Sequence, residues 1–516
     1  MTSTRAWAAA GAVTGGTAIA VSQLAASVLS VRESPLVAVA EVATRATPGI
    51  VATEAVELLA GLAKPLLVVG VVLAVGALFA VAGALWPQRR ALSVGLVATV
   101  AAVGLGAVVL RNGTGATETL PIGLGAATWL LAMTAFTVVA RRQGDATPAI
   151  PAPSATPAPG RRGFLATLGV VGLVGVCSGV TARWVEGGKS AVQDMRRLLR
   201  IPGVTQRSAP RRARIDVPGV TPWQTPNDDF YRVHTAIAVP AIDPATWKLR
   251  IHGMVEREVV LTYDEVISRG LVEAWVTLGC VSNEVGGPLL GNAWWSGVPT
   301  RDLLALAGPA AGADAVLQTS EDGWTCSTPL DALTDERGGM LAVAMNGEPL
   351  PLEHGFPART VVPGLYGYTS ACKWVVDWEV TRFADVEAYW TQRDWAERAP
   401  MRLSSRIDVP LAGEELLVGP VTVAGVAWLP GTGVADVQVS LDGGAWTSGR
   451  LAAPVTRNTW VQWAADLEVG PGPHTVRVRA VSDDGEVQTG VRRDPLPDGA
   501  TGWHEVEFTA VEEAPL

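Results

Sequence analysis

The chain has 516 residues, of which only 17% are charged, and a formal net charge of −9. This acidic balance without a basic stripe argues against nucleic acid as a partner. Four cysteines, at positions 177, 280, 326 and 372, are too few and too scattered for a disulfide scaffold or a zinc site. The mean hydropathy of +0.27 is unusual for a wholly soluble protein and indicates a membrane-embedded part.

Five apolar runs, nearly free of charge, occupy the first third of the chain. They are Ala6–Leu29, Pro65–Trp86, Ala91–Leu110, Leu120–Ala140 and Phe164–Ala182. Each has roughly the 20 residues that a helix needs to cross a membrane, and five in succession disfavour the alternative of buried core helices. We therefore predict a membrane domain over residues 1–185 with five transmembrane helices. The charged segment Pro35–Leu62 is predicted to be a surface or re-entrant piece, and Thr147–Gly160 a Pro/Ala-rich linker.

Arginines set the predicted orientation of these helices. Arg5 and the pairs at 89–90, 141–142 and 161–162 all fall on one side of the membrane if the N-terminus is cytoplasmic. The positive-inside rule then places everything after Ala182 on the extracytoplasmic side of the cell membrane. The sequence Arg161-Arg162-Gly163-Phe164-Leu165 looks like a twin-arginine export signal, although Gly160 stands where Ser or Thr is usual. The alternative is an ordinary positive-inside pair.

The five histidines all lie outside the apolar runs, which excludes bis-histidine haem ligation within the bilayer. The membrane part is therefore expected to be an anchor or a docking surface for another protein.

An α+β pattern begins after a juxtamembrane linker over residues 186–213, and we assign it to a domain over residues 214–402. Short strand-like runs alternate with turns and short helical pieces, without a regular βαβ succession. The expected strands are Trp247–Ile251, Val259–Leu261, Ala274–Leu278 and Ala315–Gln318, and the expected helices are Tyr263–Ser268 and Thr300–Ala307. Glycine-rich nucleotide motifs are missing from the sequence.

The run from Trp275 to Pro299 is the strongest candidate for chemistry. Cys280 follows the strand-like segment and Gly279 at once, so its sulfur can point into a cavity. Asn283 lies three residues on, and the pair Trp294-Trp295 follows. The alternative for the cysteine alone is a small apolar filler of the core.

Two further clusters carry polar side chains in short motifs. Asn227–His234 ends in Tyr231-Arg232-Val233-His234, and Leu350–Arg359 reads L-P-L-E-H-G-F-P-A-R and continues to Lys373. Taken alone, the cations would be interpreted as solvated surface side chains. The histidines would be interpreted as core residues with satisfied hydrogen bonds.

From about Ile407 the pattern becomes all-β, and residues 403–516 are predicted to form an immunoglobulin-like β-sandwich. Val421–Trp428, Val434–Leu441 and His474–Ala480 read as strands separated by glycine- and proline-containing turns.

Together these motifs resemble the sulfite oxidase family of molybdopterin oxidoreductases. Thr277-Leu278-Gly279-Cys280, Asn283 and Ala293–Val298 match the loop whose cysteine binds molybdenum, and residues 350–359 match the signature L-P-x-x-H-G-F-P-x-R. The resemblance covers about residues 220–510. It implies a molybdenum–molybdopterin cofactor held by Cys280 as the metal ligand. No haem is expected, because the sequence offers no ligand set for a haem or an iron–sulfur cluster. The cofactor-binding residues that it implies are Tyr231, Arg232, His234, Cys280, Thr319, His354, Arg359, Ser370 and Lys373.

In this interpretation Arg359 and Lys373 bind the pterin phosphate and His354 donates a hydrogen bond to the pterin or phosphate. The catalytic residues implied are Cys280, Arg232, Trp295 and Trp395, with the arginine orienting the substrate and the tryptophans shaping the cavity. The C-terminal sandwich resembles the family's dimerisation domain, which implies a possible homodimer. An arginine of that domain completes the pocket in some members, and Arg492 and Arg493 are the nearby candidates.

The sequence departs from the family at the substrate pocket. Glu284 and Val285 stand where sulfite oxidases have arginines, and Trp395 stands where the family has a tyrosine. An acidic residue in place of a cation weakens binding of a dianion such as sulfite. We therefore expect a two-electron oxygen-atom transfer on a small oxo-donor or oxo-acceptor, with sulfite doubtful as the physiological substrate.

Two alternatives remain open from the sequence. One is a sulfoxide or N-oxide reductase of the same family, fed with electrons by a separate electron-transfer protein or a quinone-linked subunit. The other is a cell-surface interaction protein with a cofactor-free scaffold. A disulfide between Cys326 and Cys372 in an oxidising compartment stays open, because the spacing alone does not decide it.

Overall fold

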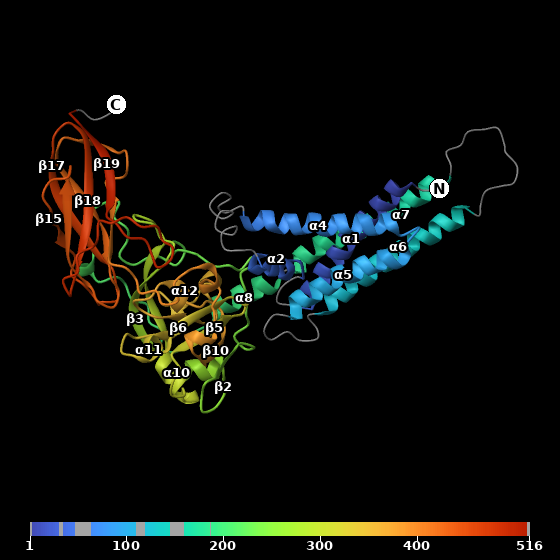
Figure 1. Ribbon diagram of the computed structural model, residues 1–516, viewed down its shortest axis with the longest axis horizontal. Helices are drawn as coiled ribbons and strands as arrows, with labels where there is room; N and C mark the ends of the chain where they lie inside the picture. The colour runs from blue at the N-terminus through green and yellow to red at the C-terminus, as the bar shows by residue number, and fades with distance from the viewer. Residues whose placement is uncertain are drawn as a thin grey trace. The chain divides into compact units, whose positions relative to one another are not determined.

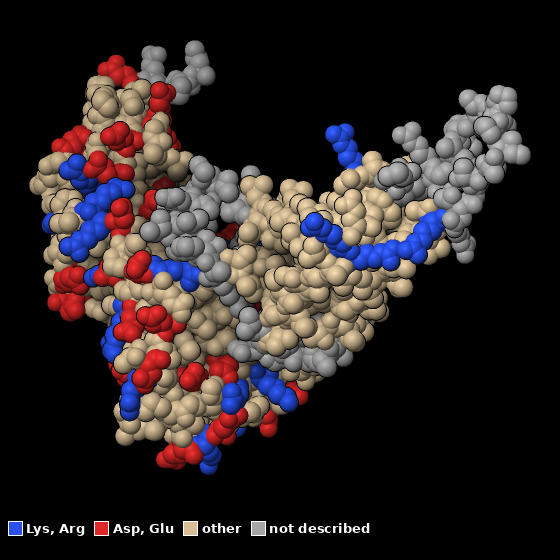
Figure 2. Space-filling view, turned by 45° about the vertical axis from the view of Figure 1, so that its right-hand side comes forward, with Lys and Arg blue, Asp and Glu red and all other residues tan. Residues whose placement is uncertain are grey.

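The computed structural model describes residues 3–29, 35–46, 63–109, 119–144, 159–185 and 187–512. Its contacts divide the chain into two units, Met1–Met195 with Ala236–Ala241 and Arg196–Thr235 with Ile242–Leu516. The first unit is helical, and the second is built mainly from strands and short helices (Figure 1). Figure 2 shows that charged side chains of both signs are interspersed on the second unit and that the surface of the first is largely uncharged. The predicted boundaries at residues 185, 213 and 402 stay predictions.

Four helices of the described first unit are long and apolar enough to cross a membrane. They are α1 (Thr4–Val28), α4 (Ala63–Leu85), α5 (Arg90–Val109) and α6 (Leu120–Gly144). They match the first four predicted spans. The fifth predicted span lies in α7 (Pro159–Val185), whose described apolar stretch, Leu165–Ser178, is shorter than a full span. The expected surface segment contains α2 (Pro35–Ala46), and residues 47–62 lie outside the described part.

Close helix packing explains why α1 is so rich in small residues. A Cβ on Gly11 would lie 2.3 Å from the Phe79 carbonyl oxygen, and one on Gly83 would lie 2.4 Å from the Trp7 carbonyl oxygen. The backbones of α1 and α4 can approach so closely only because glycine has no side chain. These contacts place the start of α1 beside the end of α4, so the two helices are antiparallel. On the other side, Thr17 Oγ1 donates a hydrogen bond to the Val171 carbonyl of α7 at 2.9 Å.

Helix α8 (Gly187–Leu198) belongs to the first unit up to Met195, and the second unit begins at Arg196. The α+β part of the second unit contains two sheets. The first sheet has the order β2-β1-β10-β5-β6, with β1 parallel to β10. Its strands are β1 (Lys248–Gly253), β2 (Val259–Thr262), β5 (Ala315–Ser320), β6 (Thr325–Pro329) and β10 (Val375–Thr381). The second has the order β3-β4-β7-β8, and β9 pairs with β7. Its strands are β3 (Val272–Gly279), β4 (Leu290–Pro299), β7 (Met340–Met345), β8 (Glu348–Pro349) and β9 (Arg359–Val361).

Short helices connect these strands, as the sequence predicts. They are α9 (Tyr263–Ile267), α10 (Thr300–Ala307), α11 (Leu330–Thr334) and α12 (Gly367–Ser370). Helix α9 begins where Thr262 and Glu265 form a capping box, in which each side chain accepts a hydrogen bond from the other residue's backbone N–H. The α+β expectation is confirmed for this part of the chain.

The C-terminal region is a two-sheet β structure, as expected; its likeness to the immunoglobulin fold stays a prediction. One sheet has the order β11-β13-β17-β16 and the other β12-β19-β18-β14-β15. The strands of the first are β11 (Ser404–Val409), β13 (Gly419–Trp428), β16 (Arg450–Leu451) and β17 (Val461–Val469). Those of the second are β12 (Glu415–Leu417), β14 (Val434–Leu441), β15 (Thr447–Ser448), β18 (Gly472–Ser482) and β19 (His504–Val511). Apolar side chains from both sheets form one core, which includes Val423, Val437, Trp463, Val478 and Phe508.

Tryptophan side chains fill the contact between this β region and the α+β part of the same unit. Trp223, Trp275 and Trp294 share a buried cluster with Trp428 and Trp460. The Trp460 backbone N–H donates to Thr277 Oγ1 of β3 at 2.9 Å, so the contact is hydrogen-bonded as well as apolar. The β region is therefore fixed to the strand that leads to Cys280.

Candidate active site

Cys280 lies in a tightly closed loop between two paired strands. The β3–β4 register pairs Gly279 with Leu290, so residues 280–289 form the connection. The Cys280 N–H donates to the Leu289 carbonyl at 2.9 Å, and Asn283 Oδ1 accepts from the Leu289 N–H at 2.7 Å. The asparagine that follows the cysteine in the sequence motif therefore closes the loop and fixes the position of the cysteine.

The thiol of Cys280 is buried, and its Sγ lies 2.9 Å from Ser282 Oγ. Burial raises the pKa of the Cys280 thiol, while the Ser282 hydroxyl and the Lys373 charge act in the opposite direction. A buried thiol of this kind loses its proton readily when it binds a cation. The geometry suits a thiolate ligand of a metal ion.

The segment before β1 brings two aromatic residues to the same place. The Phe230 ring stacks on Tyr231 with centroids 5.2 Å apart and meets Trp295 and His354 edge-on at 5.7 and 5.6 Å. Burial and the Cys280 thiolate both raise the pKa of the Tyr231 phenol, and the Arg359 charge lowers it. Tyr231 therefore stays protonated and lies within the electrostatic reach of both the cysteine and the buried arginine.

Arg359 is a buried cation without an anionic partner among the described residues. The residue is 2% exposed, and among the described residues its guanidinium donates hydrogen bonds to backbone carbonyls, of His354 at 3.2 Å and of Ala371 and Thr360 at 3.4 Å. It also lies over the Trp295 ring, 5.2 Å from the centroid. Burial lowers its pKa to about 10. A guanidinium in such surroundings is stabilised by an anion, because carbonyl contacts alone do not balance its charge.

His354 and Lys373 lie beside this arginine. Burial, Lys373 and Arg359 together lower the pKa of His354 to about 3, so the imidazole is neutral near pH 7. Its Nε2 lies 3.0 Å from the Asn227 carbonyl, which can only accept, so Nε2 carries the proton. The buried Nδ1 has no hydrogen-bond partner among the described residues and can only accept. In this structure the one N–H of the neutral imidazole is engaged by the Asn227 carbonyl, so His354 offers a ligand an acceptor at Nδ1, whereas the sequence predicts a donor.

The remaining predicted residues lie at varied distances from this cluster. Arg232 is exposed, yet its charge also lowers the pKa of His354, which places it nearby. The His234 ring meets Trp374, the residue after Lys373, edge-on at 5.5 Å. The Ser370 hydroxyl donates to the carbonyls of Leu365 and Tyr366, the two residues just before its own helix α12. Thr319 is a buried residue of β5 that pairs across the sheet with Thr325 and Asp377.

A small cavity of about 20 Å³ opens beside Cys280. Neither Trp295 nor Trp395 lines it: the Trp295 ring is fully buried, and the Trp395 ring packs on Tyr368 and Trp390. Its polar lining consists of Cys280, Asn283, Glu284, Tyr366, Ser404, Ser405 and Gln488. Ser405, Gln488 and Tyr366 were not found from the sequence, since they lie in segments without a motif. Among the described residues of the lining, Glu284 is the one with a charged side chain.

Two residues of the β region hold the cysteine loop from outside. Arg406 of β11 donates from Nη1 to the Gly287 carbonyl at 2.8 Å and from Nε to Asp408 Oδ1 at 2.7 Å. The His504 ring occupies the space where a side chain on Gly286 would lie, with its Cδ2 2.3 Å from the position of that Cβ. Arg492 and Arg493, the candidates from the sequence, are exposed and do not line the cavity.

The two other buried cysteines lie next to each other. Cys326 of β6 and Cys372 are both fully buried free thiols. Burial raises the pKa of Cys372, and the neighbouring Cys326 side chain raises it further. The structure contains the reduced pair, so the disulfide stays a prediction.

Comparison with known proteins identifies the α+β part. The family described as oxidoreductase molybdopterin binding domain matches residues 236–390. A protein called uncharacterized oxidoreductase YuiH, from Bacillus subtilis, is 36% identical over 156 residues, which are 30% of this chain and 76% of that protein. Mitochondrial sulfite oxidase from Homo sapiens is 30% identical over 315 residues, and the match covers 51% of this chain and 57% of the relative. The chain thus spans little more than half the length of the sulfite oxidases that it matches.

Among solved structures, the sulfane dehydrogenase SoxCD from Paracoccus pantotrophus is similar, with 23% sequence identity and a TM-score of 0.48. The match covers 60% of this chain and 85% of that chain.

Proposed function

The chain belongs to the sulfite oxidase family of molybdopterin-dependent oxidoreductases, and from this premise we propose that it transfers an oxygen atom to or from a small, weakly charged substrate outside the cytoplasm. The observation that carries the enzyme activity is the cluster of Cys280, His354, Arg359 and Lys373. A buried thiol, an orphaned ring nitrogen and a buried guanidinium without a counter-ion all require a partner, and the molybdenum–molybdopterin cofactor offers one for each.

Each of these side chains has a distinct role toward the cofactor. Cys280 Sγ would be the protein ligand of the metal, since thiolates suit this class of metal centre. Arg359 would bind phosphate oxygens through its planar fork, and Lys373 would add a compact positive charge. His354 Nδ1 would accept a hydrogen bond from a pterin N–H, because its Nε2–H is bound to the Asn227 carbonyl. The bound group would supply a metal that exchanges two electrons and an oxygen atom with the substrate.

The protein contributes a dry and rigid setting for this chemistry. Trp295 and Phe230 are almost fully buried beside Arg359 and exclude water from the phosphate side of the cluster. Low local polarity strengthens the charge interactions that hold the cofactor. We retain Arg232 as the substrate-orienting residue, as its exposed charge lies close enough to His354 to act on it.

The cavity beside Cys280 supports a weakly charged substrate. Glu284 is the one charged side chain among the described residues of the lining, and Arg406, which is close by, is neutralised by its ion pair with Asp408 at 2.7 Å. A dianion in this cavity would therefore meet the Glu284 carboxylate, with no cation among the described lining residues to offset the repulsion. Sulfoxides and N-oxides carry their oxygen without net charge, so reduction of such a compound is the direction that this lining favours.

The packing of the helical unit supports a membrane anchor with a cytoplasmic N-terminus. Trp7 contacts Gly83, and Trp86 donates from Nε1 to Thr137 Oγ1 at 2.7 Å. These contacts bring together the start of α1 and the ends of α4 and α6. The start of α5 follows the end of α4 in the chain, and these four helix ends are the ones that carry arginines. Helix α7 runs parallel to α1, because a Cβ on Gly172 would lie 3.7 Å from Val13 Cγ1 and one on Gly175 would lie 2.8 Å from Thr17 Oγ1. We therefore propose five spans, export through the Arg161-Arg162 signal, and an extracytoplasmic catalytic unit.

We also propose that the C-terminal β region is immunoglobulin-like and mediates homodimerisation, and that electrons pass to or from a separate redox carrier. The two-sheet arrangement with a shared core supports the first point.

Metal and pterin content of the purified protein, measured beside a Cys280→Ser variant, tests the enzyme activity. We expect about one molybdenum per chain in the wild type and an altered or missing centre in the variant. A correctly folded, exported wild type without molybdenum and pterin would refute the proposal and favour an interaction protein. Substrate screening then compares dimethyl sulfoxide and trimethylamine N-oxide with sulfite.

A further inference from the structure

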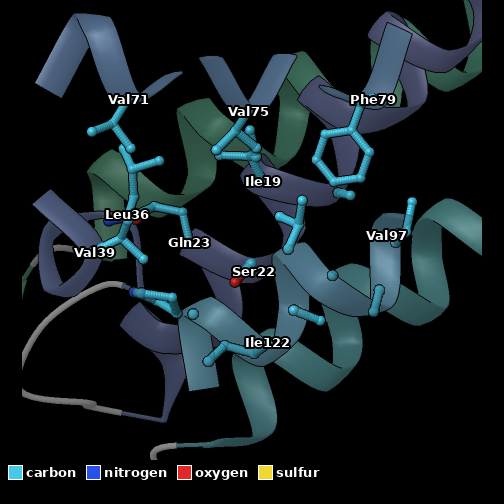
Figure 3. Close-up of a pocket in the computed structure, with 17 residues that line it drawn as sticks. Ile19, Ser22, Gln23, Leu36, Val39, Val71, Val75, Phe79, Val97 and Ile122 are labelled. Atoms are coloured by element: carbon cyan, nitrogen blue, oxygen red, sulfur yellow. The ribbon is translucent and has the colours of Figure 1, made fainter. Parts of the chain in front are cut away.

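The helical unit contains a cavity of about 110 Å³ that is separate from the molybdopterin site. Side chains from α1, α2, α4, α5 and α6 surround it, and Figure 3 shows them directed around a common space. Small residues make the room: a Cβ on Gly125 of α6 would already lie 3.0 Å from the Ala18 carbonyl oxygen and 3.2 Å from the Ser22 Cβ. The lining is apolar except for two neighbouring residues of α1, Ser22 and Gln23.

The cavity lies toward one end of the helices. It is lined by residues late in α1, early in α4, late in α5 and early in α6, for example Gln23, Val71, Gly104 and Ile122. The arginines lie at the opposite ends of these helices. In the proposed orientation the cavity therefore belongs to the extracytoplasmic half of the bilayer. Gln23 lies five residues before the end of α1, which is about 7.5 Å along the helix axis.

The two polar side chains limit what can occupy the space. Neither the Gln23 carboxamide nor the Ser22 hydroxyl has a hydrogen-bond partner among the described residues of this unit. Polar groups inside an apolar membrane region carry a free-energy cost unless they are paired, and they mark ligand sites in membrane proteins. A lipid acyl chain offers them no acceptor. A flat ring with carbonyl oxygens offers two acceptors.

We propose that this cavity binds the ring of an isoprenoid quinone. A ring carbonyl accepts hydrogen bonds from the Gln23 amide and the Ser22 hydroxyl, and the prenyl tail passes between the helices into the lipid. Val75 and Phe79 of α4 and Val97 of α5 provide the apolar contacts.

This inference rests on the proposed function and identifies its redox partner. Oxidation of a quinol to the quinone releases two electrons and two protons. Reduction of an oxo substrate to its deoxygenated product and water consumes two electrons and two protons. The two half-reactions therefore balance without a further reactant, and a quinone is a carrier that the membrane part of an oxygen-atom transferase can use.

The test uses the full-length, cofactor-loaded protein in detergent and the short-chain quinone ubiquinone-1, with binding measured by calorimetry. Gln23→Leu keeps the size of the side chain but removes its hydrogen-bonding groups, and we expect binding to weaken about 10-fold. Gly125→Leu fills the cavity and should abolish binding. Gly123→Leu on the same helix is the matched control, because a Cβ there has no neighbour within 4 Å, and it should leave binding unchanged.

Unchanged affinity in both Gln23→Leu and Gly125→Leu would overturn the inference. So would a wild-type protein that retains only phospholipid, identified by mass spectrometry of extracted lipids, and binds no ubiquinone-1. Molybdenum content and oxygen-atom transfer with an artificial dye as electron donor are measured on the same samples. These should be normal in all three variants, so loss of quinone binding is distinguished from failure of the proposed enzyme activity.

Discussion

Arg359 is the residue whose surroundings depend most on a bound anion. Replacing it with lysine keeps the charge but removes the planar fork that binds two phosphate oxygens. We expect Arg359→Lys to lower cofactor affinity about 10-fold or more, in line with the worth of a charge-assisted hydrogen bond. Pterin content of the purified protein measures this. Arg301→Lys, at an exposed arginine paired with Glu336 at 3.0 Å, is the control and should retain the full pterin content. Equal content in both variants would mean that Arg359 does not bind the phosphate.

Glu284 is one of the positions at which the sequence departs from the sulfite oxidase motif, and it lines the cavity beside Cys280. Its charge faces the cavity beside Cys280, so Glu284→Gln should make the cavity more tolerant of anions. We expect kcat/KM for sulfite to rise about 10-fold, from an effect of roughly 1.4 kcal/mol, while that for dimethyl sulfoxide changes less than about twofold. The exposed Glu348→Gln is the control. A parallel change for both substrates would show that the carboxylate acts on the cofactor or the fold and not on substrate charge.

At this scale the sequence predicts cofactor residues better than cavity residues. Cys280, His354 and Arg359 each sit in a short motif that can be recognised locally, and the structure brings them together. Tyr366, Ser405 and Gln488 come from three segments with ordinary local sequences. They meet only because the β region packs against the cysteine loop, and no local pattern encodes that packing. Which ring nitrogen of His354 carries the proton could not be predicted from the sequence either, because it depends on the Asn227 carbonyl, more than a hundred residues away.

At the scale of elements, strand β11 and the start of β19 carry the residues that hold the cysteine loop. Burial and the Arg406 charge lower the pKa of His504 to about 4, and its Nδ1 accepts the Ile407 N–H at 3.0 Å. The unfolded histidine takes up a proton near pH 6.5, whereas the folded one resists protonation down to about 4. Stability from this residue is therefore present above pH 6.5 and is lost as the pH falls toward 4.

A variant His504→Asn retains an acceptor near the same place but does not titrate. When the pH is lowered from 7 to 4.5, the thermal-unfolding midpoint of the variant should fall less than that of the wild type. The difference between the two proteins corresponds to at most about 3 kcal/mol in the free energy of unfolding. The comparison residue is His474, whose pKa is raised by the Gly470 carbonyl and Asp442. Stability from His474 is present below pH 6.5 and is lost at higher pH, so His474→Asn should shift the pH profile in the opposite direction. Parallel profiles for His504→Asn and the wild type would exclude a buried neutral histidine at 504.

The bounds of strands and helices were predicted well where nearby residues determine them. The expected strand Val434–Leu441 is β14, and it ends at Asp442 and Gly443, whose positive φ angles of 50° and 72° suit the residues of a tight turn. The expected helix Thr300–Ala307 is α10. The order of strands in the sheets was not predictable, because β1 pairs in parallel with β10, more than 120 residues later. Such pairings depend on the whole chain.

At the scale of the whole molecule, the proposed membrane anchor makes the orientation of the chain decide which compartment the enzyme would serve. Two exposed residues report on the two sides: Gln88 lies between α4 and α5, and Ala445 lies between β14 and β15. Cys177 is an exposed cysteine in α7, so both reporters are built on a Cys177→Ala background, in which the three other cysteines are buried. Single cysteines at these positions can then be labelled selectively.

A membrane-impermeant maleimide added to intact cells should label Ala445→Cys and leave Gln88→Cys unlabelled until the membrane is permeabilised. The reason is that the arginines cluster at the helix ends beside Gln88, which the positive-inside rule retains in the cytoplasm. Replacing Arg161 and Arg162 with lysines in the Ala445→Cys protein should abolish labelling in intact cells if export of the folded domain depends on that pair. If only Gln88→Cys is labelled in intact cells, the orientation is the opposite of the proposed one. It would place the oxygen-atom transfer in the cytoplasm and the quinone cavity in the opposite leaflet.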